Sequence, residues 1–239
     1  ALLYVPLGDT NFCLGGSSFA QVTNQIGEKA PAVSDPEKFL AGFTLLQELI
    51  SEEKILAGHD VSAGGLITCL LEMCFGRNDT GLEADISVLS EADIIRKLFS
   101  EQPAAVIQVE AQEVPGIINE FASIEIPVNQ IAKVVTERKF IIANGSTFID
   151  LDIDSQRDTW YKTSWLLDRK QTHGNVADQR FANYKKQELR YTFPKHFSGK
   201  LVDMQLEWKR KKISGIRAAI IREKGVNGDR EMAYSLFQA

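Results

Sequence analysis

The sequence has few of the features that mark membrane, secreted or nucleic-acid-binding proteins. No apolar run reaches the roughly 18 residues of a membrane span, and the opening ALLYVPLG lacks the charged start and cleavage site of a signal peptide. Only three cysteines occur, with no CxxC pair, which argues against a disulfide framework or a zinc site. A net charge of −5 argues against a nucleic-acid surface. We therefore expect a reduced, cytoplasmic protein with neither membrane nor nucleic-acid partners.

The composition is that of a globular protein, but both ends look cut. Hydrophobic residues make up 44% of the chain and charged residues 25%, which is too apolar for disorder. The chain has no initiator Met, and it ends at Ala239 inside the helix-forming stretch REMAYSLFQA without a stop signal. We expect a piece of a longer polypeptide, so an activity that needs residues beyond either end would be missing.

Periodicity predicts an α/β (α+β) fold with a mixed sheet covered by helices. Helical spacing of apolar residues, as in Phe39, Phe43, Leu46 and Ile50, predicts helices over residues 35–53, 64–75, 91–101 and 114–124. Short apolar or alternating runs predict strands over residues 1–7, 81–89, 104–110, 129–136, 139–145 and 147–153. Helices alternate with strands at first and adjacent strands follow, a pattern typical of a mixed sheet.

The character of the chain changes after Asp154. Residues 155–215 read as a helical connector, with Trp160, Trp165 and Leu166 as its apolar anchors. Its basic cluster Lys209–Lys212 is short, so a solvated linker edge is favoured over a nucleic-acid site. Residues 216–239 then predict a strand, a turn and a helix, the first half of a flavodoxin-like unit. The expected domains are 1–154, 155–215 and 216–239.

The stretch GHDVSAGGL, residues 58–66, places polar and flexible residues directly before an apolar helix. Ser62 is placed to cap that helix, and Gly64 and Gly65 allow a ligand or another backbone to approach closely. Helix N-termini attract phosphate. The Asp60 carboxylate would repel phosphate unless Mg²⁺, which prefers oxygen ligands, lies between them. The motif thus suggests a metal–nucleotide or metal–phosphate contact.

The same residues also allow a purely structural interpretation. Asp60 and Ser62 would then only cap the helix, and His59 would be a structural histidine; spacing alone does not separate the two. The loop LGGSS offers Gly15, Gly16 and Ser17 either as anion contacts or as a turn. Cys13 has no histidine nearby in sequence, so we do not expect it to be a catalytic nucleophile.

Five segments, in their order and spacing, resemble the family of large, single-chain phosphoribosylformylglycinamidine synthases. They are LGGSSFAQV (14–22), GHDVSAGGLITCLLEMCFG (58–76), GLEADIS (81–87), AAVIQVE (104–110) and AAIIREKGVNGDREMA (218–233). The resemblance implies the C-terminal subdomain of the second AIR-synthase-like half, then a connector, then the start of a class I glutamine amidotransferase domain.

The resemblance also implies a function. The family uses ATP and glutamine to convert formylglycinamide ribonucleotide into formylglycinamidine ribonucleotide in purine biosynthesis. Asp60 then corresponds to a Mg²⁺ ligand and Ser62 to a nucleotide contact (ATP or ADP), in a catalytic or an auxiliary site. Gly64 and Gly65 are further candidates for nucleotide or phosphate binding, and Gly15, Gly16 and Ser17 are weaker phosphate candidates. The implied partners are the nucleotide, the phosphoribosyl substrate and the remaining domains of the same chain. The piece alone is expected to be inactive.

Two alternatives stay open at this stage. Other ATP-using members of the AIR-synthase superfamily share the subdomain but lack the trailing segment REKGVNGDREMA, which argues against them. A non-catalytic scaffold subdomain would use the glycines only to pack helix on sheet, and replacing Asp60 distinguishes that case from a metal site.

Overall fold

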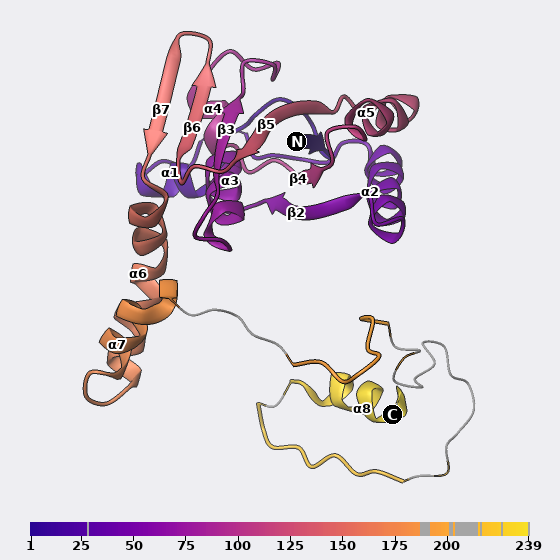
Figure 1. Cartoon of the computed structure of the whole chain (residues 1–239), viewed down its shortest axis with the longest axis vertical. Helices are drawn as coiled ribbons and strands as arrows, with labels where there is room; N and C mark the ends of the chain where they lie inside the picture. The colour runs from indigo at the N-terminus through magenta and orange to yellow at the C-terminus, as the bar shows by residue number, and fades with distance from the viewer. Residues whose placement is uncertain are drawn as a thin grey trace. The chain divides into compact units, whose positions relative to one another are not determined.

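The computed structural model describes residues 1–27, 29–186, 192–200, 203, 215, 217–225 and 227–238. It divides the chain into two compact units, Ala1–Lys185 and Lys186–Ala239. The first unit contains one sheet and most of the helices (Figure 1). The boundary that we expected after Asp154 lies inside this unit, because helix α6 (Ile153–Gln171) follows the last strand directly.

The sheet has seven strands in the order β2-β4-β1-β5-β3-β6-β7. Only β3 and β6 pair in parallel, and the other neighbours are antiparallel. The predicted mixed sheet is therefore confirmed. The strands are β1 (Leu2–Pro6), β2 (Ile55–Val61), β3 (Gly81–Asp85), β4 (Ala104–Val109), β5 (Asn129–Val135), β6 (Phe140–Asn144) and β7 (Thr147–Leu151).

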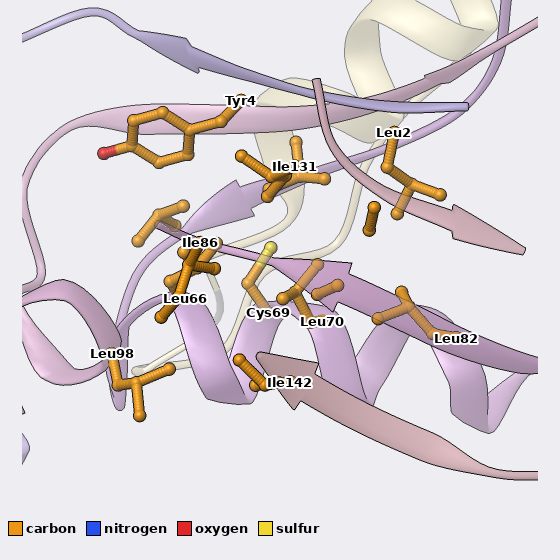
Figure 2. Packing of buried hydrophobic residues seen from close by; sticks show 14 of the residues in the cluster. Leu2, Tyr4, Leu66, Cys69, Leu70, Leu82, Ile86, Leu98, Ile131 and Ile142 are labelled. Carbon is orange, nitrogen blue, oxygen red and sulfur yellow. The ribbon is translucent and has the colours of Figure 1, made fainter. Parts of the chain in front are cut away.

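The central strand β1 explains why the chain opens with an almost unbroken apolar run. Successive side chains of a strand point to opposite faces. Leu2 and Tyr4 enter one hydrophobic core, whereas Leu3 and Val5 enter the other. A strand that is buried on both faces needs apolar residues at every position. Figure 2 shows the first core, where Leu2, Tyr4 and Ile131 of the sheet lie over Leu66 and Leu70.

Helices cover both faces of the sheet. On one face, α2 (Pro36–Ser51) and α5 (Val114–Ser123) lie beside each other (Figure 1) and bury Leu49 and Phe121 completely. On the other face, α3 (Gly65–Phe75), α4 (Ile94–Phe99) and Ile153 at the start of α6 supply helical residues to the first core. In the described part of the chain, no helix is long and apolar enough to cross a membrane.

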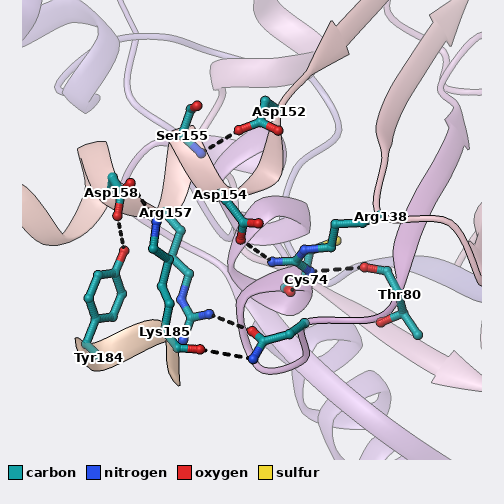
Figure 3. A network of polar contacts seen from close by, with 11 residues as sticks. Cys74, Thr80, Arg138, Asp152, Asp154, Ser155, Arg157, Asp158, Tyr184 and Lys185 are labelled. Carbon is teal, nitrogen blue, oxygen red and sulfur yellow. Dashed lines mark hydrogen bonds and ion pairs between the residues drawn. The ribbon is translucent and has the colours of Figure 1, made fainter. Parts of the chain in front are cut away.

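Within the first unit, the long helix α6 is attached to the sheet layer through Arg138, which lies just before β6. Its guanidinium donates to the carbonyls of Cys74 and Thr80 and pairs with Asp154 at 2.9 Å (Figure 3). Helix α7 (Val176–Asn183) and a 3₁₀ turn (Tyr184–Lys186) then fold back on α6, with the Tyr184 hydroxyl donating to Asp158. The expected helical connector is thus helical over residues 155–171 and 176–186, with a turn between the two stretches.

Several element predictions need correction. No strand was predicted at residues 55–61, because Gly58, His59 and Asp60 break the apolar pattern that marks strands. Strand β3 ends at Asp85, and α4 begins only after Asp93, which caps it.

In the second unit, helix α8 (Asp229–Gln238) forms as predicted. Residues 217–223 form no strand, since a single strand has no neighbour to satisfy its backbone groups. The basic cluster Lys209–Lys212 lies outside the described residues.

Candidate functional site around Asp60

Asp60 lies on β2, an edge strand of the sheet. It pairs with Ala105 of β4, and its side chain is 75% exposed. An edge strand has only one neighbour in the sheet, so its side chains can reach solvent on the free side. Asp60 has no salt bridge to Lys or Arg among the described residues, so its carboxylate is available to an incoming cation.

Ser62 does not cap helix α3, and that prediction was wrong. The N-cap residue is Gly64, at φ +90°, and it makes no side-chain cap bond. Ser62 instead accepts the Gly65 N–H on its backbone carbonyl at 2.9 Å. The Ser62 hydroxyl is exposed and bonds to no other described group. The residue therefore presents a free oxygen two positions after the Asp60 carboxylate.

Gly64 and Gly65 are required by the backbone of this turn. Gly65 has a φ of +75°, and a Cβ there would lie 2.5 Å from the Leu98 carbonyl oxygen. A Cβ on Gly64 would lie 2.3 Å from the Thr68 hydroxyl. Only glycine adopts positive φ at no steric cost. The pair thus allows α3 to begin tightly against the end of α4, which is sufficient to explain both residues.

In the loop LGGSS, the backbone amides of the four residues after Leu14 are already bonded. Gly15 donates to the Lys29 carbonyl at 2.7 Å and Gly16 to the Ile26 carbonyl at 2.8 Å. Ser17 is buried; its hydroxyl donates to the Leu14 carbonyl and caps the short helix α1 (Ser18–Val22). The loop is therefore a closed turn, with little left to offer an anion.

Glu101 brings the two glycine–serine loops together. One of its carboxylate oxygens accepts the N–H groups of Ser18 at 2.7 Å and Gly64 at 2.8 Å, at the starts of α1 and α3. Burial acts to raise the pKa of Glu101, but the hydrogen bonds from Gly64 and Ser18 outweigh burial, and the pKa is lowered. Sequence reasoning missed this residue, because a single Glu after a helix carries no signal of a distant partner.

His59 is engaged on both ring nitrogens. Nε2 lies 3.2 Å from a carboxylate oxygen of Glu72, on α3. Nδ1 lies 2.7 Å from the backbone carbonyl of Asp60 and 3.5 Å from its carboxylate. The histidine therefore belongs to the structural surroundings of Asp60.

The cysteines are core residues, as expected for Cys69 and Cys74. All three are buried and free of disulfides. Burial, with smaller contributions from the carboxylates of Asp60 and Glu72, raises the pKa of Cys69 to about 12. Burial likewise raises the pKa of Cys74 to about 11. Since the thiolate is the nucleophilic form, neither Cys69 nor Cys74 is suited to covalent catalysis at neutral pH.

A complete metal site is not present in the described part of the chain, where no three His, Cys, Asp or Glu side chains are placed to hold one ion. The available donors are the free carboxylate of Asp60 and the free hydroxyl of Ser62. This set fits Mg²⁺ in a particular way, since protein-bound Mg²⁺ often takes one or two carboxylates and completes its shell with water and substrate phosphates. The residues therefore fit a Mg²⁺–nucleotide complex better than an all-protein metal cage.

Comparison with known proteins agrees with this architecture. Residues 7–143 match the family described as AIR synthase related protein, C-terminal domain. Human phosphoribosylformylglycinamidine synthase is 32% identical over 237 residues, which cover 97% of this chain but only 17% of the human protein.

A solved structure of PurL from Thermotoga maritima in complex with FGAR is similar in fold. It is 18% identical, with a TM-score of 0.51, and the match covers 64% of this chain and 27% of that chain. On the strength of the family match and the mixed sheet described above, the chain belongs to the AIR synthase related protein family through its C-terminal domain.

Proposed function

We propose that the chain is part of a phosphoribosylformylglycinamidine synthase. Such an enzyme is an ATP-dependent carbon–nitrogen ligase that uses glutamine as amido donor to make formylglycinamidine ribonucleotide. The support is the similarity to the human enzyme of that name, which extends over 97% of this chain and beyond the family domain. The proposal assigns residues 1–154 to the AIR-synthase-like subdomain, 155–215 to a connector and 216–239 to the start of an amidotransferase domain.

The exposed pair of Asp60 and Ser62 carries the site assignment: the Asp60 carboxylate has no Lys or Arg partner among the described residues, and the Ser62 hydroxyl bonds to none of them. Asp60 would contribute a carboxylate ligand to Mg²⁺, and Ser62 would hydrogen-bond the nucleotide, either ATP or ADP. The bound ion would neutralise phosphate charge, which lets a carboxylate and a phosphate share one site. Gly64 and Gly65 would shape the turn. The loop of Gly15, Gly16 and Ser17 is a less favoured phosphate contact, because its amides are already bonded.

The partners follow from the same proposal. They are the nucleotide, the phosphoribosyl substrate and the other domains of the enzyme; the PurL structure with the similar fold was solved with FGAR bound. Asp60 alone cannot complete a metal shell, so the isolated chain would have no turnover of its own. The setting would be the cytoplasm.

The test is calorimetric titration of Mg·ADP into the full-length protein that contains this chain, wild type against Asp60→Asn. The matched control is Asp150→Asn, which changes an exposed aspartate on β7, at the opposite edge of the sheet. We expect Asp60→Asn to weaken binding more than the roughly tenfold that loss of an outer-shell partner costs, and the control to bind as wild type.

Glutamine-dependent turnover on the same variants separates the two kinds of site. Lost turnover together with lost binding places Asp60 in the working ATP site. Loss of nucleotide binding with turnover retained marks an auxiliary, structural site. Unchanged binding and turnover would overturn the metal assignment and favour the scaffold alternative.

A further inference from the structure

The carboxylate of Glu72 joins three elements around the candidate site. Glu72 lies on α3, and one of its oxygens is 3.2 Å from Nε2 of His59, on β2. Its other oxygen accepts the indole N–H of Trp160, on α6, at 2.6 Å. The Glu72 side chain is 24% exposed and that of His59 30%, so their contact is partly shielded from water, whereas Trp160 is 53% exposed. One acidic residue thus connects the edge strand to the long helix that follows the sheet.

His59, which Glu72 contacts through Nε2, also contacts Asp60 through Nδ1. Because Nε2 is held by Glu72, the ring is oriented with Nδ1 at 2.7 Å from the Asp60 carbonyl and 3.5 Å from its carboxylate. Rotating the ring would break the contacts at both nitrogens. The orientation of His59 therefore restricts both the backbone and the side chain of Asp60, although that side chain is largely exposed.

The Trp160 end is fixed by packing as well as by its hydrogen bond. The indole ring lies against Phe75, at the end of α3, with centroids 5.6 Å apart and planes inclined by 57°. Tilted aromatic pairs of this kind stabilise their contact beyond the area that they bury. Trp160 thereby attaches helix α6 to α3. Arg138 anchors the beginning of α6 at Asp154, about 1.7 helical turns earlier.

We propose that Glu72 and Trp160 are positioning residues for the metal-binding carboxylate of Asp60. Glu72 orients His59, His59 restrains Asp60, and Trp160 from α6 holds Glu72 in place. This inference rests on the function proposed above, since it assumes that Asp60 binds Mg²⁺. Its consequence is that the packing of α6 sets the affinity of the site for the metal.

The experiment compares Trp160→Phe with Trp165→Phe in the full-length protein. Phenylalanine at 160 keeps a ring against Phe75 but removes the N–H that Glu72 accepts. Trp165 is a matched control, because it lies on the same helix and its indole N–H also donates to a carboxylate, that of Asp178 at 2.9 Å, away from Asp60. The probe is ADP, titrated by calorimetry with and without saturating Mg²⁺.

We expect Trp160→Phe to weaken Mg·ADP binding by roughly threefold to tenfold, the range typical of changes along a coupled network. Binding of ADP without Mg²⁺ should not change, and Trp165→Phe should bind as wild type in both conditions. Glu72→Ala, which removes both contacts, should have at least the effect of Trp160→Phe. A merely structural role would instead lower the thermal midpoint and weaken both titrations equally.

The outcomes also separate this inference from the proposed function. If Asp60→Asn loses Mg·ADP while Trp160→Phe binds like Trp165→Phe, the positioning role is overturned and the metal site stands. If Asp60→Asn binds Mg·ADP as wild type, both fail together. If Glu72→Ala does not fold, Trp160→Phe decides, since it retains the ring packing on Phe75.

Discussion

The Glu101 carboxylate accepts the backbone N–H of Gly64 at 2.8 Å, at the start of helix α3. The same oxygen accepts the N–H of Ser18, at the start of α1. A carboxylate at a helix N-terminus is favoured by the unsatisfied amides and by the helix dipole. The sequence led us to expect a bound phosphate at this helix N-terminus. Glu101 supplies the negative charge there instead, while the carboxylate of Asp60 has no Lys or Arg partner among the described residues.

The Glu101 arrangement predicts a pH-dependent contribution to stability. The folded-state pKa of Glu101 is lowered, so its contribution is present above the unfolded pKa of about 4.3 and is lost as the pH falls through the folded value. We expect Glu101→Gln, which keeps the shape but not the charge, to be less stable than wild type at pH 7. Urea midpoints should converge between the two as the pH falls below about 4. A difference independent of pH would contradict the role of the charge.

Gly65 should not tolerate alanine. Its φ of +75° and the 2.5 Å approach of the Leu98 carbonyl combine backbone strain with a clash. We expect Gly65→Ala to lower the free energy of unfolding by at least about 2 kcal/mol, since the left-handed conformation alone costs about 1–2 kcal/mol. The control is Gly116→Ala in α5, where no atom lies within 4 Å of the added Cβ. There, alanine should stabilise the helix by up to about 1 kcal/mol. Equal effects in urea unfolding would refute this explanation of the turn.

A few residues show which parts of the fold and of the candidate site could be predicted from the sequence. The helices at 35–53 and 114–124 are predictable from the helical spacing of their apolar residues. The buried face of the first was predicted only in part, because Phe43 and Ile50 are exposed while Leu46 and Leu49 are buried. The exposed position of Asp60 could not be predicted from the sequence, because it depends on β2 becoming an edge strand. Ser62 failed as a cap because a glycine at positive φ begins the helix two residues later. Local spacing alone cannot anticipate that geometry.

Contacts between residues far apart in the sequence could not be predicted either, as Glu72, Glu101 and Trp160 show. Each acts through a partner more than ten residues away in sequence, at separations of 37 residues for Gly64–Glu101 and 88 for Glu72–Trp160. Such pairs exist only once the topology has brought the elements together. A single sequence contains no periodic or motif signal for them, and the residues that surround the candidate site therefore emerge only from the fold.

Arg138 should be far more important to stability than an exposed arginine. It donates to the Cys74 and Thr80 carbonyls and pairs with Asp154, with only 18% of its side chain exposed. We expect Arg138→Met to cost at least about 2 kcal/mol, because hydrogen bonds to charged groups contribute about 1.5–3 kcal/mol each. Arg77→Met removes a surface pair with Asp79, 68% and 66% exposed, and should destabilise the protein far less than Arg138→Met, because solvent screens exposed pairs. Urea unfolding of both variants checks the contrast, and similar costs would mean that α6 is held elsewhere.

The thiols should be unreactive in the folded chain. Cys69 and Cys74 are buried, and their pKa values are raised to about 12 and about 11. Thiolate is the reactive form, so a disulfide reagent at pH 7.5 should label them slowly in the native protein and rapidly in urea. Labelling of native Cys69 at the rate seen in urea would show that α3 opens readily. Glutamine-dependent turnover of the full-length protein should survive Cys69→Ala, since no catalytic role is assigned to that thiol.

The buried hydroxyl of Tyr4 should be needed as the hydrogen-bond acceptor for the side-chain amide of Gln102. The Gln102 side chain is 1% exposed; its amide nitrogen donates to the Tyr4 hydroxyl at 2.5 Å, and its oxygen accepts the Phe12 N–H at 3.1 Å. Tyr4→Phe leaves that buried donor without its acceptor, which should cost about 1–3 kcal/mol in urea unfolding. Tyr161→Phe, on the partly exposed α6, is the control and should stay within about 0.5 kcal/mol of wild type.

The hydroxyl of Tyr4 should lose its proton only at high pH. Burial raises the pKa of Tyr4 to about 12, and the hydrogen bond from Gln102 only partly opposes this. A raised folded-state pKa means that the contribution to stability is complete below the unfolded pKa of about 10 and is lost as the pH rises towards the folded value. Absorbance of tyrosinate in wild type minus Tyr4→Phe should therefore show the Tyr4 transition near pH 12 and not near 10. A transition near 10 in the native protein would mean that water reaches Tyr4 and that the first core is open beside β1.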